Sequence, residues 1–210
     1  MANMVLSRIL ALVAAVVWLN LCEAQPSEAL RAILDGNTAL FNSTGHAKSK
    51  GTAFTMKYPK NWEEREGERP NVVKKIEYSE GKGMVVVIII TKALPANLAM
   101  TRKDAEELLT PSEMKTMIPD EATFVSGVST KIEGEPAGIL EYTATNERAG
   151  VKMKTHVNSL IFFQGNTMVQ VQFNVGAVES EANGLSDRAA SWKPVFQAMM
   201  NTIVFPNKWK

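Results

Sequence analysis

Residues 151–175, VKMKTHVNSLIFFQGNTMVQVQFNV, decide the fold class. Two runs rich in β-branched and aromatic residues, 151–163 and 167–175, flank the turn-forming Gln164-Gly165-Asn166. Apolar and polar residues alternate along both runs, as in Val169, Val171 and Phe173 against Gln170 and Gln172. This period of two predicts an antiparallel hairpin, with one face apolar and the other wet over part of its length.

The segment before this hairpin extends the sheet. Residues 84–90, MVVVIII, are wholly apolar, which predicts a central strand covered on both faces. Further strand patterns occupy residues 53–58, 72–78, 124–132, 137–145 and 202–205. Helical patterns lie within residues 26–41, 101–109, 110–118 and 187–201. Consecutive strands with separated helices predict an α+β fold, an antiparallel sheet with helices on both faces in an α/β/α sandwich.

The first 24 residues predict where the protein is located. Arg8 precedes an apolar run over 9–21, and Ala24 stands before Gln25 as a small residue at a cleavage site. The apolar run is shorter than the roughly 20 residues of a membrane-spanning helix. We therefore expect a signal peptide over 1–24, cleavage between Ala24 and Gln25, and export to the periplasm or the exterior. Lipid attachment at Cys22 is the alternative, and the bulky Leu21 before it disfavours that site.

Removal of this segment would leave a helix and linker over 25–51, followed by one domain over 52–210. It would also remove Cys22, the only cysteine, and with it disulfide, thiol and thiolate–metal chemistry. The 23 Lys and Arg residues balance 22 Asp and Glu residues, giving a net charge of +1. A near-neutral chain without a basic block gives no support for a nucleic acid as partner.

Reaction motifs are missing from the sequence. Its two histidines, His46 and His156, lie among polar and basic neighbours, and we expect His156 to be a solvated residue on the wet side of its strand. The carboxylates of residues 63–69 alternate with arginines, which favours a solvated loop or irregular edge over a cation site. We therefore expect no catalytic, cofactor-binding or metal-binding residues, although a Ser-His-Asp triad assembled from distant segments stays open.

Three short segments carry a family resemblance. FTMKYPKNW at 54–62 resembles the F-x-x-x-Y-P-x-x-W strand and turn of PsbP-like domains, and IEGEPAG at 132–138 resembles their Gly-x-Pro-Ala turn. VFQAMMNTIVF at 195–205 is similar to their terminal helix and its short end, with Thr202 and Ile203 in place of the more usual Ser and Phe. The residues of these motifs for which we expect structural roles are Tyr58, Pro59, Trp62, Gly134 and Pro136.

The resemblance implies an antiparallel sheet with helices on both faces. Family members bind proteins or act as assembly factors, and they supply no shared catalytic constellation. The leading hypothesis is thus an exported, non-catalytic binding or assembly protein without a cofactor. Its partner would be another envelope or secreted protein, and no membrane span would remain after signal removal. A small-molecule or lipid carrier and a hydrolase with a dispersed site are the alternatives.

Overall fold

A computed structural model describes residues 26–209 except 80–82, 96–99 and 149. The predicted signal peptide and its cleavage site at Ala24 and Gln25 lie outside the described residues. Where the chain is described, none of the helices has the length and apolar character needed to cross a membrane.

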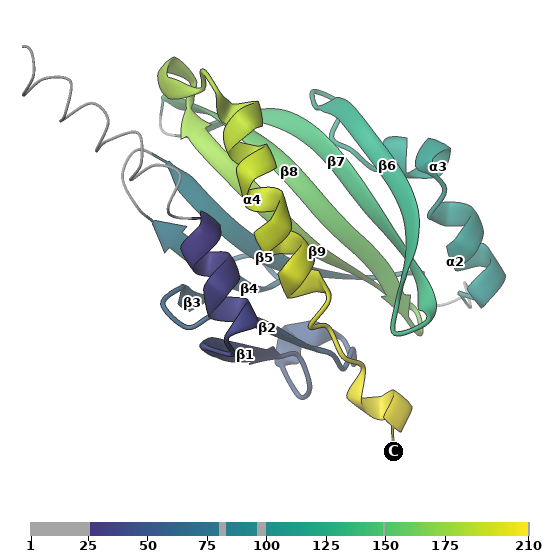
Figure 1. The fold of residues 1–210 in the computed structure, drawn as a ribbon. Helices are drawn as coiled ribbons and strands as arrows, with labels where there is room; N and C mark the ends of the chain where they lie inside the picture. Colours follow the sequence, from purple (N-terminus) through teal and green to yellow (C-terminus); the bar gives the residue numbers. More distant parts are fainter. Residues whose placement is uncertain (1–25, 80–82, 96–99, 149, 210) are drawn as a thin grey trace, which may run out of the picture.

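A seven-stranded antiparallel sheet forms the centre of the molecule, in the order β3-β4-β5-β9-β8-β7-β6 (Figure 1). This strand order places the predicted hairpin, β8 and β9, in the interior of the sheet and leaves β3 and β6 at its two edges. The strands are β3 (Glu63–Glu66), β4 (Val72–Ser79), β5 (Met84–Ala93), β6 (Thr123–Ile132), β7 (Glu135–Arg148), β8 (Val151–Gln164) and β9 (Thr167–Val178).

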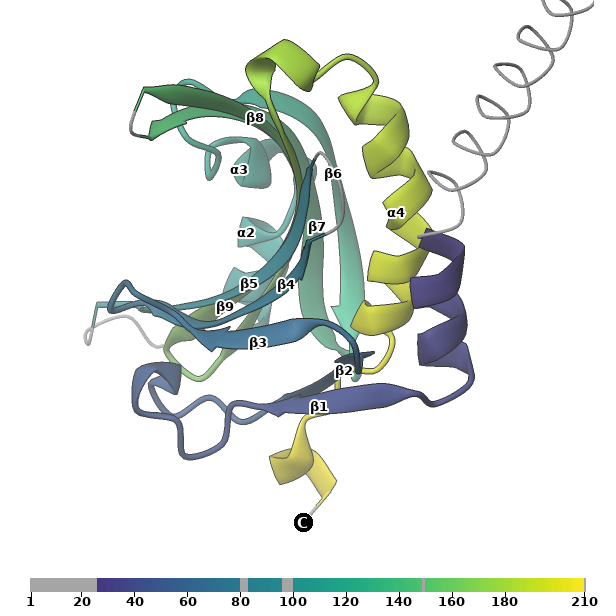
Figure 2. The same ribbon diagram turned by 90° about the vertical axis from the view of Figure 1, so that its left-hand side faces the viewer.

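One face of the sheet packs against α4 (Leu185–Met200), which runs along β8 and β9. Trp192 and Phe196 are buried in the large core beneath this helix, together with Leu160 and Phe162 of β8. Pro194 stands inside the helix, which begins at Leu185, just before the expected pattern of residues 187–201. A helix over residues 26–34 lies beside α4 (Figures 1 and 2).

The other face carries a smaller core beneath α2 (Arg102–Leu108) and α3 (Pro111–Lys115). Leu109 and Met114 pack there against Leu140 and Ile161. Since neighbouring residues of a strand point to opposite faces, Leu160 under α4 and Ile161 under α3 place the two cores on opposite sides of the sheet. Figure 2 shows α4 and α2–α3 on the two sides of the curved sheet. The contacts of α2 and α3 with the sheet are made with β6 and β7.

Two expectations need correction. The 84–90 strand was expected to be covered on both faces. Val85, Val87 and Ile89 on the α4 face are fully buried, whereas on the other face Val86 is buried but Ile88 and Ile90 are only half-buried. The reason is that α2 and α3 cover β6 and β7 rather than β5.

The first helix pattern is also shorter than expected. It ends at residue 34, before Gly36 with φ of 78°, a left-handed conformation that suits glycine. Residues Thr38–Asn42 form β1, which pairs with β2 (Thr55–Pro59) in a separate two-stranded sheet. Phe41 and Phe54 join this small sheet to the large core.

Candidate functional site

The predicted Tyr-Pro-x-x-Trp residues occupy packing positions. Pro59 is the last residue of β2, and Trp62 is buried with its ring 5.6 Å from that of Tyr78 and 5.9 Å from that of Trp192. The Tyr58 hydroxyl donates a hydrogen bond of 2.8 Å to Glu64. Burial, together with this carboxylate, raises the pKa of Tyr58 to about 12. The surroundings of Trp62 are thus aromatic side chains of the core.

The predicted Gly-x-Pro residues shape the β6–β7 hairpin. Glu133 and Gly134 both have positive φ, of 52° and 79°, which is the signature of a two-residue type I′ turn. Lys208 fastens this turn by donating to the Glu133 carbonyl oxygen at 2.6 Å. Lys208 also donates a hydrogen bond to the carboxylate of Glu135, and this bond holds the pKa of Glu135 below the ordinary value. Pro136 follows at the start of β7 and lines a cavity described below.

The expectation for His156 was wrong. Its imidazole is buried, and Nε2 lies 2.7 Å from Oε1 of Glu141 on the neighbouring strand. His156 and Asn158 lie on the same face of β8 as Leu160, the face that packs against α4, and both are buried there. His46, by contrast, caps a short 3-10 turn and lies 3.2 Å from Glu66.

The carboxylate of Glu141 accepts hydrogen bonds from side chains of three other elements. Besides His156, Ser126 Oγ of β6 donates to Oε2 at 3.0 Å, and Lys193 Nζ of α4 lies 3.2 Å from the same oxygen. Burial by itself would raise the pKa of Glu141, but the hydrogen bonds from His156, Ser126 and Lys193 outweigh it and hold the pKa below the ordinary value. The ionised carboxylate is therefore the centre of the group.

The order of these groups argues against a catalytic triad. In a triad the histidine stands between the hydroxyl and the carboxylate, so that it can take the hydroxyl proton. Here Glu141 stands between Ser126 and His156, and the serine proton is directed at the carboxylate. The Nδ1 atom of His156 is buried without a hydrogen-bond partner. The cluster is thus suited to joining α4 to the sheet rather than to activating a nucleophile.

The carboxylates of β3 form ion pairs with cationic side chains. Glu63 and Arg65 of β3 form an ion pair at 2.7 Å, and Glu64 pairs with Lys74 at 3.1 Å. Within the described part of the chain, no three His, Cys, Asp or Glu side chains gather as they would around a metal ion. Residues 63–66, expected as a loop or irregular edge, form the short edge strand β3 with all four side chains charged and exposed.

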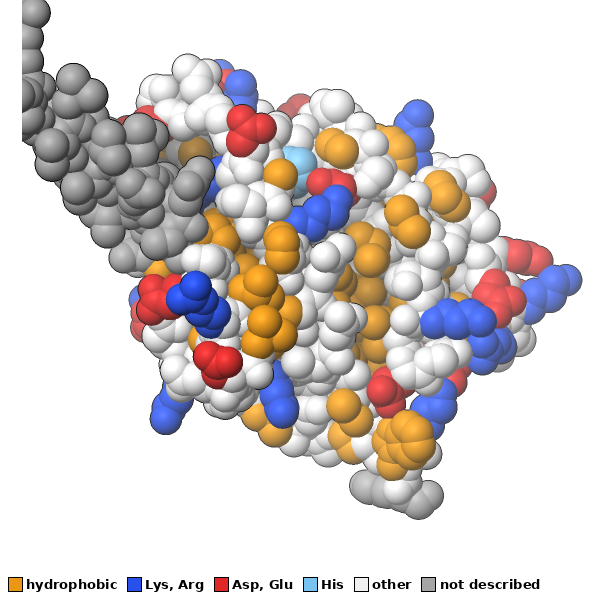
Figure 3. Space-filling view, in the orientation of Figure 1, with side chains coloured by type: hydrophobic (Ala, Val, Ile, Leu, Met, Phe, Trp, Pro, Cys, Tyr) orange, Lys and Arg blue, Asp and Glu red, His pale blue; other side chains and the backbone are white. Residues whose placement is uncertain are grey.

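The opposite edge of the sheet is different in character. β6 has ten residues, of which Lys131 alone is charged. Val128 on the α4 side and Val125 at a β-bulge are 55% and 48% exposed. Opposite Val128 lies Ile139 of β7, which is only partly buried because α4 lies over β8 and β9. Figure 3 shows apolar side chains exposed on this face of the molecule. We call the edge and exposed face of β6, with Ile139, the β6 surface.

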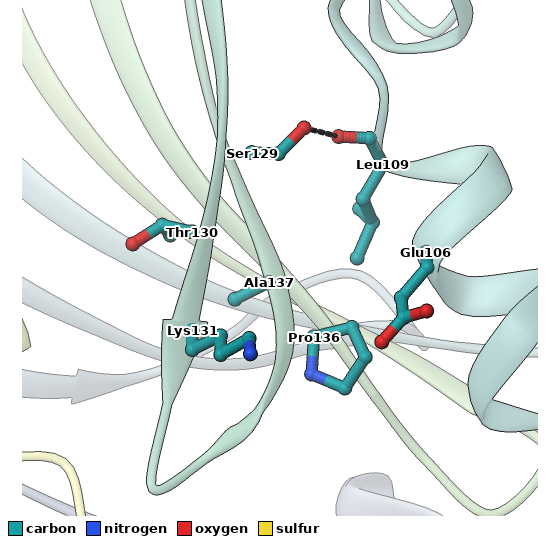
Figure 4. A pocket seen from close by; sticks show the side chains of 7 residues that line it. All are labelled: Glu106, Leu109, Ser129, Thr130, Lys131, Pro136 and Ala137. Carbon is teal, nitrogen blue, oxygen red and sulfur yellow. Dashed lines mark hydrogen bonds between the residues drawn. The ribbon is translucent and has the colours of Figure 1, made fainter.

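A cavity of about 270 Å³ opens beside β6, next to α2 (Figure 4). Its wall combines apolar side chains with Ser129, whose hydroxyl donates to the Leu109 carbonyl oxygen at 2.8 Å. It is lined by Glu106, Leu109, Ser129, Thr130, Lys131, Pro136 and Ala137. A second cavity, of about 680 Å³, lies near the β8–β9 turn and the C-terminal segment and has a more polar lining that includes Lys50, Gln164 and Lys208.

No family model matches this sequence, and a search of curated proteins finds no relative. Among solved structures, the chain is similar to PsbP of the cyanobacterium Synechocystis sp. PCC 6803, at 12% identity over 80% of this chain and 92% of that one, with a TM-score of 0.44. It is similar to LpqN of Mycobacterium tuberculosis, described as involved in cell envelope biogenesis, at 14% identity over 82% and 93% of the two chains, with a TM-score of 0.43.

A protein of Bacteroides thetaiotaomicron is also similar, at 18% identity over 83% of this chain and 50% of that one, with a TM-score of 0.42. At such identities the likeness concerns the fold alone. The solved structures that this chain resembles thus include a PsbP protein, as the three sequence segments predicted.

Proposed function

We propose that this chain is an exported, non-catalytic binding or assembly protein, which engages another envelope or secreted protein through the β6 surface. The observation that carries the proposal is the contrast between the two sheet edges. Natural sheets protect an edge by keeping it short or charged, as in β3. β6 is long, carries one charge, and presents exposed valines.

Three further features support this assignment. Exposed apolar side chains beside a strand edge are typical of a protein interaction site. The order of Ser126, Glu141 and His156 offers no activated nucleophile. The export part of the proposal rests on the signal-peptide pattern of residues 1–24.

The carrier alternative is less well supported by the two cavities. The core between α4 and the sheet is filled by side chains such as Trp192, Phe173 and Leu160, each at most 1% exposed. The cavities of about 270 and 680 Å³ lie instead at the rim of the sheet, beside β6 and beside the β8–β9 turn. A bound lipid chain would need room within this packed layer.

Site-specific photocrosslinking tests the proposal. A photoreactive amino acid at Val128 should capture a protein in the cells that produce this chain, whereas the same group at Leu34, which is 71% exposed on the first helix, should not. The captured protein, once identified and purified, should bind the wild-type chain directly. Val128→Asp should weaken this binding at least tenfold, and Leu34→Asp should leave it unchanged.

Two outcomes would contradict the proposal. One is equal capture from Val128 and Leu34, which would indicate contact without a preferred surface. The other is a captured partner whose direct binding is insensitive to Val128→Asp while the variant remains folded by circular dichroism.

A further inference from the structure

The backbone of β6 has hydrogen-bonding groups to offer a partner. Because a two-residue type I′ turn joins β6 to β7, Ile132 and Glu135 face each other as a hydrogen-bonded pair. Such pairs alternate along an antiparallel ladder, so the N–H and C=O groups of Lys131, Ser129 and Gly127 point away from β7. Among the described residues, no backbone hydrogen bond joins these three amides to another segment.

The space beyond this edge is bounded on one side by helices. Figure 1 shows α2 and α3 reaching past β6, and α3 contacts β6 on the face opposite to α4. A strand added beside β6 would thus lie against these helices, with alternate side chains directed at the cavity between β6 and α2. At about 270 Å³, that cavity exceeds the roughly 150 Å³ that holds a benzene-sized group.

The charges at the cavity indicate what the added strand should carry. Glu106 is paired with Arg102 at 3.2 Å, and Glu135 with both Lys208 and Arg102. Lys131 has no ion pair with any described residue, and its side chain is exposed at the cavity mouth. An acidic side chain on the partner would complement it.

A second copy of the chain fits this edge poorly. Two β6 strands paired around a two-fold axis normal to the sheet would place both α2–α3 pairs on the same side, each reaching past its edge toward the other. A single extended segment meets no such obstacle.

We propose that the partner contributes an extended segment that pairs with β6 as an eighth strand of the sheet. The segment seats an apolar side chain in the cavity beside α2 and sets a carboxylate against Lys131. This inference deepens the proposed function and rests on it, since it names the form in which the partner meets the β6 surface.

Selection from a library of random twelve-residue peptides on the purified chain tests this inference. The selected peptides should carry an apolar residue and an acidic residue two positions apart, because alternate residues of a strand share a face. Every second backbone amide of a paired peptide points toward β6. Methylation of those amides should weaken binding at least tenfold, whereas methylation of the amides between them should have little effect.

A matched pair of variants tests the same pairing from the protein side. Lys131→Thr removes the charge and keeps the outward amide, whereas Lys131→Pro removes both at a position that an edge strand tolerates. Binding of the selected peptide should fall at least tenfold further in Lys131→Pro than in Lys131→Thr. If Lys131→Pro fails to fold, the binding of the methylated peptides to the wild-type chain still tests whether the peptide pairs with β6.

Several results would overturn the inference. They are the absence of enriched peptides, equal binding by the two Lys131 variants, and indifference to amide methylation. Light scattering could instead show a dimer that Lys131→Pro dissociates and Lys131→Thr preserves. That result would mean that β6 pairs with a second copy of this chain and not with a segment of another protein. Crosslinking of a protein at Val128 that ignores Lys131→Pro would refute strand addition while leaving the proposed β6 surface in place.

Discussion

Replacement of Glu141 by alanine should destabilise the protein by about 2–4 kcal/mol, because a hydrogen bond between a buried group and a charged one contributes about 1.5–3 kcal/mol. The buried His156 loses its partner at 2.7 Å in this variant, and Ser126 loses its partner at 3.0 Å. Lys193 is 47% exposed and returns to water, so its share is at most about 1 kcal/mol. Glu141→Gln keeps the shape and should cost about half as much.

Urea denaturation at pH 7, followed by circular dichroism, measures this difference. The slope of the free energy of unfolding against urea concentration should equal that of the wild type, since the surface area exposed on unfolding is unchanged. The pKa of Glu141 is lowered in the folded chain, so its ionised form stabilises the fold at pH values above the ordinary 4.5 and this contribution is lost as the pH falls through the lower folded pKa. The gap between wild type and Glu141→Gln should therefore close in that acidic range.

A loss below 0.5 kcal/mol for Glu141→Ala would refute this reasoning, because it would mean that the three donors gain nothing from the carboxylate. A gap between wild type and Glu141→Gln that widened on acidification would contradict the direction of the pKa shift. Ser126→Ala serves as the matched control, since it removes one donor and leaves the His156 contact intact.

Further predictions concern packing and titration. Gly138→Ala should cost about 1–3 kcal/mol in urea unfolding, because its Cβ would overlap Met114 Sδ and lie 3.2 Å from Leu109 Cδ2; an unchanged midpoint would show that α3 shifts freely. Trp62→Ala should lower the free energy of unfolding by about 3–5 kcal/mol in the same assay, and Trp62→Phe should lower it less. Small and equal losses in the two variants would show that the Trp62 ring does not contribute to core packing. Ultraviolet titration should find a tyrosine that ionises only at about pH 12 and that disappears in Tyr58→Phe; because a raised pKa favours the neutral form, this contribution to stability is lost as the pH rises beyond 10.

The sequence predicted the hairpin of β8 and β9 because its alternation is local. It could not predict that β5 pairs with β9, or that β6 is an edge, because both depend on pairings between distant segments. The misassignment of His156 has a similar cause. Lys154, His156 and Asn158 indicate a wet face, yet Leu160 and Phe162 continue that same face into the core, so one side of β8 changes character along its length.

The β6 surface shows the same limit of sequence patterns. Val128 and Ser129 looked like ordinary members of a strand, and only the strand order reveals that the backbone beside them has no neighbour among the described residues. The cavity depends on Leu109 and Pro136, which lie 27 positions apart and meet because α2 packs on β7. The length of β6 and its near absence of charge were the signals available in advance.

Hydrogen exchange of the β6 amides, resolved by NMR with and without the partner captured at Val128, tests the central claim most directly. In the free chain the amides of Gly127, Ser129 and Lys131 should exchange quickly, while that of Val128 is protected by β7. Addition of the partner should slow the exchange of those three amides at least tenfold and leave β3 unchanged. Protection that appears on another element, with these three amides still exchanging as in the free chain, would contradict the assignment of β6 as the binding edge.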